Sequence, residues 1–420
     1  RACRGRRPSA ASEVPTGRPA TAPPNALAGG CADPRLRYGG RSVISAASTP
    51  SSKDAPAGPA RVQRGAILAY RVFDVGDTIA LDEAERRLEG SGRVEMGGPL
   101  TEGLVIPSRP LEVELGECEL TFRGLTEPVV ASARAHLFDF GVTSILYEIP
   151  IEPGTPLTAL IPICDALYDA PELDERGRAH RKELLERLGP CVEKPHEWLE
   201  AESYTIVFAE ELAGESLAEL ARSETVAKLL LGESSDKPLS VAVRDDVLKN
   251  AFSYLSDDLV IIDWNSALVV EPSGSRIVPH VLELATSQLL EFRYYDGILE
   301  RELTRVYDFI EKARPRILRS PYAALRRDVL RRLMELTEFT ERVDNAIKSV
   351  GDFYLARVYL SAIKRSRVPE WRESVEAKLT LVSRAYELLK SEVEISRSQL
   401  LEVIIVLLIL IEVVNTFVRH

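Results

Sequence analysis

The sequence lacks the short motifs by which many enzymes and metalloproteins are recognised. It has no G-x-x-x-x-G-K-[ST] phosphate loop, no G-x-G-x-x-G after a strand and no G-x-S-x-G turn. Its five cysteines include no C-x-x-C pair, and its five histidines stand at no H-E-x-x-H spacing, which argues against a disulfide framework and a zinc centre. We therefore expect no catalytic residues, no cofactor and no metal ion, and predict that the protein is not an enzyme.

Acidic residues outnumber basic ones after the first 64 positions. Residues 1–64 carry 11 Lys and Arg against 3 Asp and Glu, whereas the rest of the chain carries 42 against 61. Because an acidic body repels the phosphate backbone, nucleic acid is not expected as a partner.

Residues 1–64 are rich in Arg, Ala, Pro, Gly and Ser and poor in large apolar side chains. Such a composition cannot bury enough surface to fold, so we expect this stretch to be disordered. Arg-rich, Ser-rich and acid-poor sequence is typical of an organellar targeting segment. The alternative is an artefactual extension with no function.

The stretch 65–277 mixes helix and strand patterns and is predicted to form an α+β domain. The runs "GAILAYRVFDVG" and "AESYTIVFAEEL" are typical of strands. "ARAHLFDFGVTSILYEIPI" indicates a strand, a turn at Gly141 and a second strand, and "DDLVIIDWNSALVVEP" indicates another hairpin. The alternation in "LEVELG" is typical of strands with one buried face.

Residues 278–399 are predicted to be almost wholly helical. Apolar residues recur at alternating spacings of four and three in three runs, which "RPRILRSP" and "SRVPEW" interrupt. That spacing is typical of helices packed side by side along a seam. The sequence therefore predicts a long antiparallel coiled-coil bundle of three helices.

The most apolar stretch, residues 400–418, is predicted to be one C-terminal transmembrane helix. Its length as a helix is about 28 Å, close to the roughly 30 Å of a bilayer core. Glu402 and Glu412 lie inside it, about 80° apart around the helix, so that one protein-facing sector can hold both. The segment therefore also indicates self-association, and a buried oligomer core is the alternative.

This predicted span makes the protein single-pass and tail-anchored in a membrane. We expect its body on the cytoplasmic side; the alternative is the matrix side of the mitochondrial inner membrane. In an antiparallel bundle, a basic patch near the start of the second helix would lie at the headgroups and bind anionic lipid, whereas the alternative is a solvated face. The patch comprises Arg326, Arg327, Arg331 and Arg332.

Three segments, "HLFDFGVTSILYEIPI", "PHVLELATSQLLEFRYYDGILE" and "LLEVIIVLLILIEVV", occur in an order that resembles the family named for "required for meiotic nuclear division". This YagE-like domain of unknown function tends to end with an acidic residue, an Ile-rich run and Ile-Glu, which Glu402, Ile411 and Glu412 match. A Trp frequent after the first Glu is Val403 here. The resemblance covers about residues 130–418. It implies a membrane-anchored scaffold, with mitochondrial relatives that support translation at the inner membrane, and it implies no catalytic residues.

Together these features predict a non-enzymatic, membrane-anchored scaffold or assembly factor that forms homo-oligomers through its helices and its C-terminal span. The alternative is a channel or transporter subunit with Glu412 lining the pathway, because an α+β domain, long helices and a terminal span also resemble magnesium channels of the CorA type. Those channels have two spans and a Gly-Met-Asn loop, whereas this sequence predicts one span and has no such loop.

Overall fold

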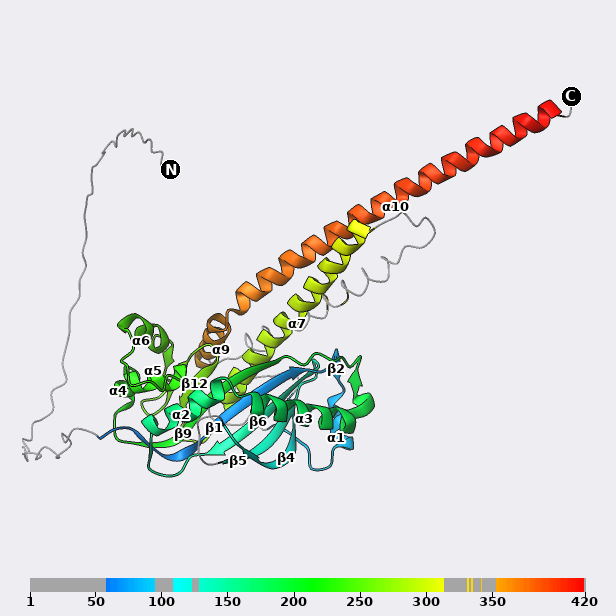
Figure 1. The fold of residues 1–420 in the computed structure, drawn as a ribbon. Coiled ribbons are helices and arrows are strands. Elements are labelled where there is room, and N and C mark those ends of the chain that lie inside the picture. The colour runs from blue at the N-terminus through cyan, green and yellow to red at the C-terminus, as the bar shows by residue number, and fades with distance from the viewer. Residues whose placement is uncertain are drawn as a thin grey trace, which may run out of the picture. The chain divides into compact units, whose positions relative to one another are not determined.

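A computed structural model describes residues 58–94, 109–122, 128–312, 331, 334, 341 and 353–418 (Figure 1). Most of the N-terminal 64 residues lie outside these ranges, so their predicted disorder and targeting role stay predictions. The predicted domain boundaries after residues 64, 277 and 399 stay predictions as well.

A ten-stranded mixed sheet forms the centre of the described chain. Its strands are β1 (Arg61–Asp74), β3 (Gly92–Arg93), β4 (Leu111–Leu120), β5 (Val129–Leu137), β6 (Val142–Pro150), β7 (Thr155–Pro156), β9 (Ala201–Ala213), β10 (Ala251–Phe252), β11 (Leu259–Ile262) and β12 (Ser266–Val270). They lie in the order β10–β11–β12–β9–β1–β6–β5–β4–β3, and β7 pairs with the start of β1. Neighbouring strands are antiparallel except β12 and β9, which are parallel. A separate small sheet joins β2 (Thr78–Ile79) to β8 (Val192–Glu193).

Both predicted hairpins are present. Strands β5 and β6 join at Gly141, whose φ of 87° is a conformation that glycine adopts without steric cost. Strands β11 and β12 pair on either side of the Trp264–Asn265 turn.

Helices cover both faces of this ten-stranded mixed sheet, which corrects the predicted fold class. The start of β4 keeps the alternation predicted for "LEVELG". Nine consecutive residues of β1, from Ala66 to Asp74, are buried. A strand that is buried on both faces has a near-continuous apolar sequence, as "AILAYRVF" does. The fold is therefore three layers, helix–sheet–helix, around two separate apolar cores.

One core lies between the sheet and the helices α2 (Leu157–Tyr168), α3 (Pro171–Leu188) and α5 (Glu224–Leu231). The shorter α1 (Leu81–Arg87), η1 (Gly189–Cys191), α4 (Leu217–Leu220) and α6 (Val241–Leu248) lie around its edge. The buried Arg71 of β1 points into this layer, where its guanidinium donates to Asp174 of α3 at 2.5 Å.

The second core lies on the opposite face, beneath α7 (Ile277–Lys312) and α9 (Phe353–Arg365) (Figure 1). Leu68 and Val72 of β1 belong to it, together with Leu282 of α7 and Leu355 of α9. The Tyr359 hydroxyl donates to Gln288 at 2.5 Å and so joins the two helices in the buried layer. This face carries the candidate site described below.

Helix α10 (Val368–Val418) packs along α7, and the two run in the same direction. Ser374 and Lys378 bond to Asp296 at 2.8 and 3.1 Å, and Lys378 also reaches Glu300 at 2.5 Å. The apolar contacts of this pair include Phe292, Leu299, Val375 and Val382. The predicted middle helix ends in α9, which packs on the sheet and α7, and most of the rest of it lies outside the described residues. The predicted coiled coil is therefore not supported.

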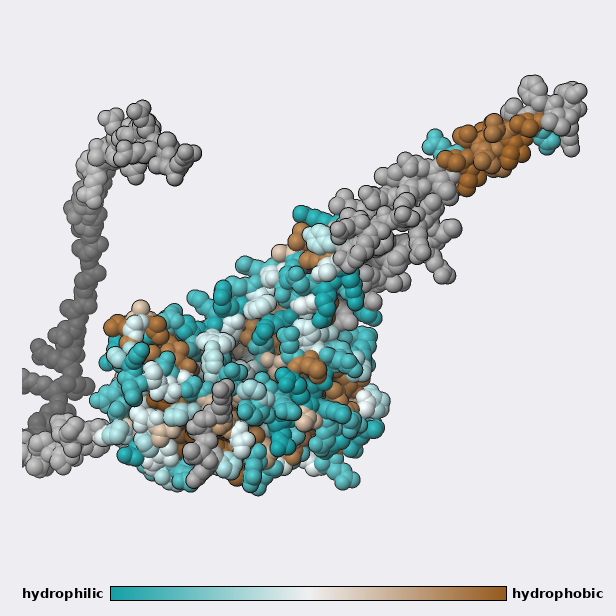
Figure 2. Space-filling view, viewed as in Figure 1, coloured by the Kyte–Doolittle hydropathy of each residue, from teal (hydrophilic) through white to brown (hydrophobic). Residues whose placement is uncertain are grey.

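The predicted transmembrane helix at residues 400–418 is wrong. Among the helices of the described ranges, none is long and apolar enough to cross a membrane. The uninterrupted apolar run between Glu402 and Glu412 has nine residues, from Val403 to Ile411, whereas a span needs about 20. The predicted tail anchor and the single-pass membrane localisation, whether cytoplasmic-side or mitochondrial, are corrected with it. Figure 2 shows the run as a short apolar band near the end of α10.

A buried carboxyl group on the sheet, beside a partly exposed arginine of α7, predicts a pH-dependent stability. Burial raises the pKa of Glu202 on β9 to about 7, although the guanidinium of Arg293 beside it acts in the opposite direction. Because this pKa is higher than in the unfolded chain, Glu202 stabilises the fold fully below about pH 4.5, and that contribution is lost as the pH rises through 7. The loss is at most roughly 3 kcal/mol.

We expect Glu202→Gln to flatten the dependence of the unfolding midpoint in urea on pH between 5 and 8. The exposed Glu117→Gln on β4 serves as the matched control and should keep the wild-type slope. Equal slopes for wild type and Glu202→Gln would contradict the prediction.

Candidate functional site

Three polar side chains lie in one row across the sheet face that α7 covers. Glu112 of β4 is paired with His136 of β5, which is paired with Ser144 of β6. Side chains of directly opposed residues in antiparallel strands point to the same face. His136 and Ser144 are buried, and Glu112 is partly exposed. The sheet therefore presents a buried polar row to the helix above it.

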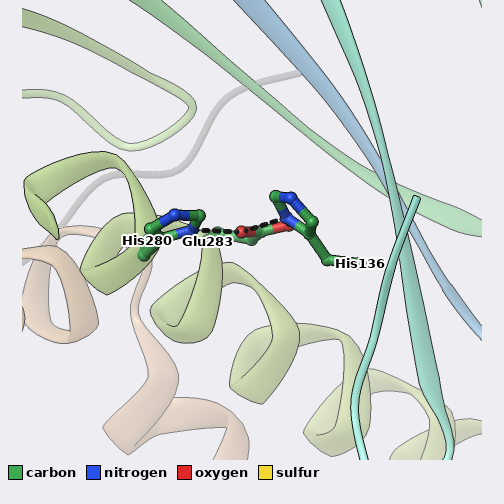
Figure 3. Close-up of side chains that lie close together, drawn as sticks. All are labelled: His136, His280 and Glu283. Atoms are coloured by element: carbon green, nitrogen blue, oxygen red, sulfur yellow. Dashed lines mark hydrogen bonds and ion pairs between the residues drawn. The ribbon is translucent and has the colours of Figure 1, made fainter. Parts of the chain in front are cut away.

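Helix α7 brings His280 and Glu283 to this row (Figure 3). The two residues are three positions apart and share one helix face. The Nδ1 atom of His136 lies 2.8 and 2.9 Å from the two carboxylate oxygens of Glu283. The Nδ1 atom of His280 lies 3.3 Å from Oε2 of the same carboxylate. Two imidazoles from segments far apart in the sequence thus converge on one buried carboxylate.

The other nitrogen of His136 is also held in place. Its Nε2 atom lies 3.1 Å from Oε2 of Glu112. Glu112 lies 3.8 Å from the guanidinium of Arg134, which also bonds to Glu148, and Arg276 donates to Glu148 at 2.7 Å. A chain of alternating charges therefore runs from the site to the start of α7 and fixes the orientation of the His136 ring.

The charges at the site are strongly coupled. Burial alone would lower the pKa of His136, but the negative charge of Glu283 and the hydrogen bonds to both carboxylates outweigh it and raise the pKa to about 9. Burial would raise the pKa of Glu283, but His136 and His280 outweigh burial and lower it to about 2. At neutral pH the site therefore holds a buried imidazolium–carboxylate pair, which joins β5 to α7.

The residues singled out from the sequence lie elsewhere. Glu402 and Glu412 are exposed on α10, and Arg331 is helical and exposed. Arg326, Arg327 and Arg332 lie outside the described residues. The structure does not bring any of the described ones to the site on the sheet, and the predicted lipid contact of the basic patch stays a prediction.

Sequence reasoning missed His136, His280 and Glu283. One local signal was present, because His280 and Glu283 stand three apart in the helical "PHVLE". His136 and Arg134 are also the two polar residues of a mostly apolar strand segment, "ARAHLF". Their meeting depends on the packing of α7 against the sheet, which no local pattern encodes.

Comparison with known proteins identifies the family of the sheet domain. The family model described as "Uncharacterized protein MJ0711, N-terminal domain" matches residues 64–276, half of the chain. The chain belongs to this family. The matched segment holds Glu112, His136 and Ser144 and ends just before α7. The family model therefore includes the residues that the sheet contributes to the site, and its match does not extend to His280 and Glu283 on α7.

A relative in the same family is "Uncharacterized protein MJ0711" of Methanocaldococcus jannaschii, which is 24% identical over 214 residues. The match covers 51% of this chain and 65% of that protein, so the chain spans less than two thirds of the length of this curated relative. No solved structure matches the chain.

Membership of this family corrects the resemblance to the family named for "required for meiotic nuclear division". The matching model covers residues 64–276, whereas that resemblance was specific only at the end of the chain, around Glu402 and Glu412. A short acidic and Ile-rich ending recurs easily in helices, which explains why it misled. The membrane-anchored scaffold that the resemblance implied is therefore withdrawn with the span.

Proposed function

We propose that this protein is a non-enzymatic assembly factor that binds further copies of itself through the distal part of α10, residues 401–414. The observation that carries the proposal is the exposure of this segment. Its large apolar side chains, Leu401, Val403–Ile411 and Val414, are each between 45% and 62% exposed. Nine consecutive apolar residues cover every side of a helix, and contiguous apolar surface of this kind marks an interaction site.

A second copy of α10 fits this surface. The positions at which α10 packs on α7, Val375 and Val382, continue at spacings of four and three to Val403, Leu407 and Leu410. These residues form a seam on one side of α10. Glu402 lies about 105° and Glu412 about 170° around the helix from the centre of that seam. Identical helices can therefore pair along the seam while both carboxylates stay in water.

The seam is tested by placing the same charge on either side of the helix. We expect Leu407→Lys with Leu410→Lys to dissociate the oligomer. Burying a leucine contributes about 1.5–3 kcal/mol, so the loss of two per chain weakens association at least roughly 100-fold. Ile405→Lys with Ile409→Lys removes equal apolar surface from the outer side and should leave the oligomer largely intact. Sedimentation velocity in detergent-free buffer measures the mass against the 46.5 kDa of one chain.

Two results would overturn the proposal. One is a wild-type chain that sediments at the single-chain mass at every concentration examined. The other is equal dissociation of the seam variant and the outer-face variant, which would mean that the apolar band associates without the seam.

A further inference from the structure

We infer that His136, His280 and Glu283 bind one divalent transition-metal ion, of which Zn²⁺ suits the ligands best. The inference is independent of self-association through α10 and departs from the expectation of no metal that the sequence motifs gave. It rests on four features of the site: the kind of ligand atoms, their convergence, the support behind them and their enclosure.

The ligand atoms are two imidazole nitrogens and one carboxylate. Zinc takes nitrogen and oxygen ligands of this kind and is bound in many proteins by three side chains, with a water in the fourth position. Imidazole disfavours Mg²⁺ and Ca²⁺, which prefer oxygen ligands throughout. The chemistry of the set therefore selects a transition metal.

The ligand atoms also converge closely enough for one ion. One ligand atom from each of the three residues lies within 4.8 Å of the other two. Ligands about 2.1 Å from a tetrahedral zinc ion lie about 3.4 Å apart. The separation of 2.8 Å between His136 and Glu283 needs to open by about 0.6 Å, and that of 3.3 Å between His280 and Glu283 by about 0.1 Å. The ligand atoms lie within 4.8 Å of one another, so the two histidines need to approach by at most about 1.4 Å. Rotation of the Glu283 carboxylate and of the partly accessible His280 ring would supply these movements.

A carboxylate stands behind one of the proposed ligands. In metal sites the second nitrogen of a ligating histidine usually donates to a carboxylate, which fixes the ring and its tautomer. Glu112 occupies that place for His136, 3.1 Å from Nε2, and is itself held near Arg134. The arrangement leaves Nδ1 of His136 facing His280 and Glu283, and the ion would take the place of the proton that Nδ1 shares with Glu283 in the metal-free protein.

The site is enclosed but not sealed. The side chains of His136 and Glu283 are 1% exposed, whereas that of His280 is 11% exposed and offers a route of entry. Ser144 is opposite His136 in register and points to the same face, and its buried hydroxyl makes no hydrogen bond among the described residues. That hydroxyl is the group we expect to accept or donate a hydrogen bond to a water on the ion. With β5 and α7 both supplying ligands, the ion would join the sheet to the helix.

The test uses the full-length, tag-free chain after treatment with a chelator. Isothermal titration with Zn²⁺ is expected to show one ion bound per chain, and Zn²⁺ is expected to raise the thermal unfolding midpoint. Co²⁺ serves as a second probe, because its visible absorption is much stronger in a four-coordinate site than in a six-coordinate one.

Three variants distinguish this site from adventitious binding. His280→Ala removes the most accessible ligand with little damage to the core, and we expect at least a 100-fold loss of Zn²⁺ affinity. Glu112→Gln keeps all three ligands but weakens the support of His136, and we expect about a 10- to 100-fold loss. His180→Ala is the matched control, because His180 contacts Tyr147 on the other side of the sheet and belongs to no group of possible metal ligands within the described part of the chain. It should bind Zn²⁺ as the wild type does.

Any of three outcomes would overturn the inference. The wild-type chain takes up no stoichiometric Zn²⁺; His280→Ala binds Zn²⁺ as tightly as the wild type; or Co²⁺ gives only the weak spectrum of a six-coordinate ion. His280→Gln repeats the test with a side chain of similar size, so a folding defect in His280→Ala leaves the inference falsifiable.

Discussion

Replacing Glu283 with leucine is expected to lower the free energy of unfolding by about 3–5 kcal/mol in the presence of a chelator. The carboxylate is the buried counterion of His136 and is 1% exposed. Without it, His136 must either stay charged in an apolar layer or lose its proton, although the remaining carboxylate, Glu112, favours the charged ring. Both states are costly, because a buried charge without its partner loses solvation that nothing replaces. Chemical denaturation with urea measures the loss.

The double variant His136→Leu with Glu283→Leu provides the decisive comparison. Removing both partners of a buried pair is often neutral or stabilising, since no uncompensated charge remains. We therefore expect the double variant to recover most of the stability that Glu283→Leu loses. If the double variant is as unstable as the sum of the two single variants, the pair is not the reason that Glu283 matters.

Replacing Gly141 with alanine is expected to cost roughly 3 kcal/mol or more, since its conformation and its surroundings both exclude a side chain. The φ of 87° is strained for any residue with a Cβ atom. A Cβ added here would lie 1.8 Å from the carbonyl oxygen of Gly76. The atom that the Cβ would meet is a backbone atom, which cannot rotate away as a side chain could. The two segments are also held together, because the Val75 N–H donates to the Gly141 carbonyl at 2.9 Å. The turn cannot move away without breaking this bond.

Gly116→Ala separates the two causes. Gly116 lies at an irregularity in β4 with a φ of 90°, and a Cβ atom there would meet nothing within 4 Å. We expect Gly116→Ala to cost only the backbone strain, about 1–2 kcal/mol. The difference between the two thermal unfolding midpoints measures the close approach at Gly141. Equal losses would show that the contact with Gly76 adds nothing.

The parts of the fold that sequence reasoning predicted are those set by local chemistry. Gly141 marked the β5–β6 turn because few other residues adopt its φ, and the Trp264–Asn265 turn was flanked by two β-branched runs. The three-layer arrangement was missed because burial on both faces removes the alternation by which a strand is recognised. The terminal helix was misjudged because its apolar residues were summed across Glu402 and Glu412, although the uninterrupted run is short.

The candidate site was out of reach for a different reason. His136 and Glu283 are 147 positions apart and meet only when α7 lies across β5. The pairing of Lys378 with Asp296 is similar, since each residue alone is an ordinary charge on a helix surface. Long-range pairs of this kind are set by packing, whereas sequence periodicity reports only which face of an element is apolar.

The central position of β1 also sets the order in which this protein can form on the ribosome. Strand β1 is the first described element to be made, yet Ala66 pairs with Phe208 on one side and Pro150 on the other. Helix α9, which helps to cover its second face, ends only at Arg365. Until residue 213 has emerged, an unpaired apolar strand edge stays open to other chains. Such late closure slows folding and favours aggregation of unfinished chains. Successful synthesis therefore depends on shielding the first half of the sheet until the second half arrives.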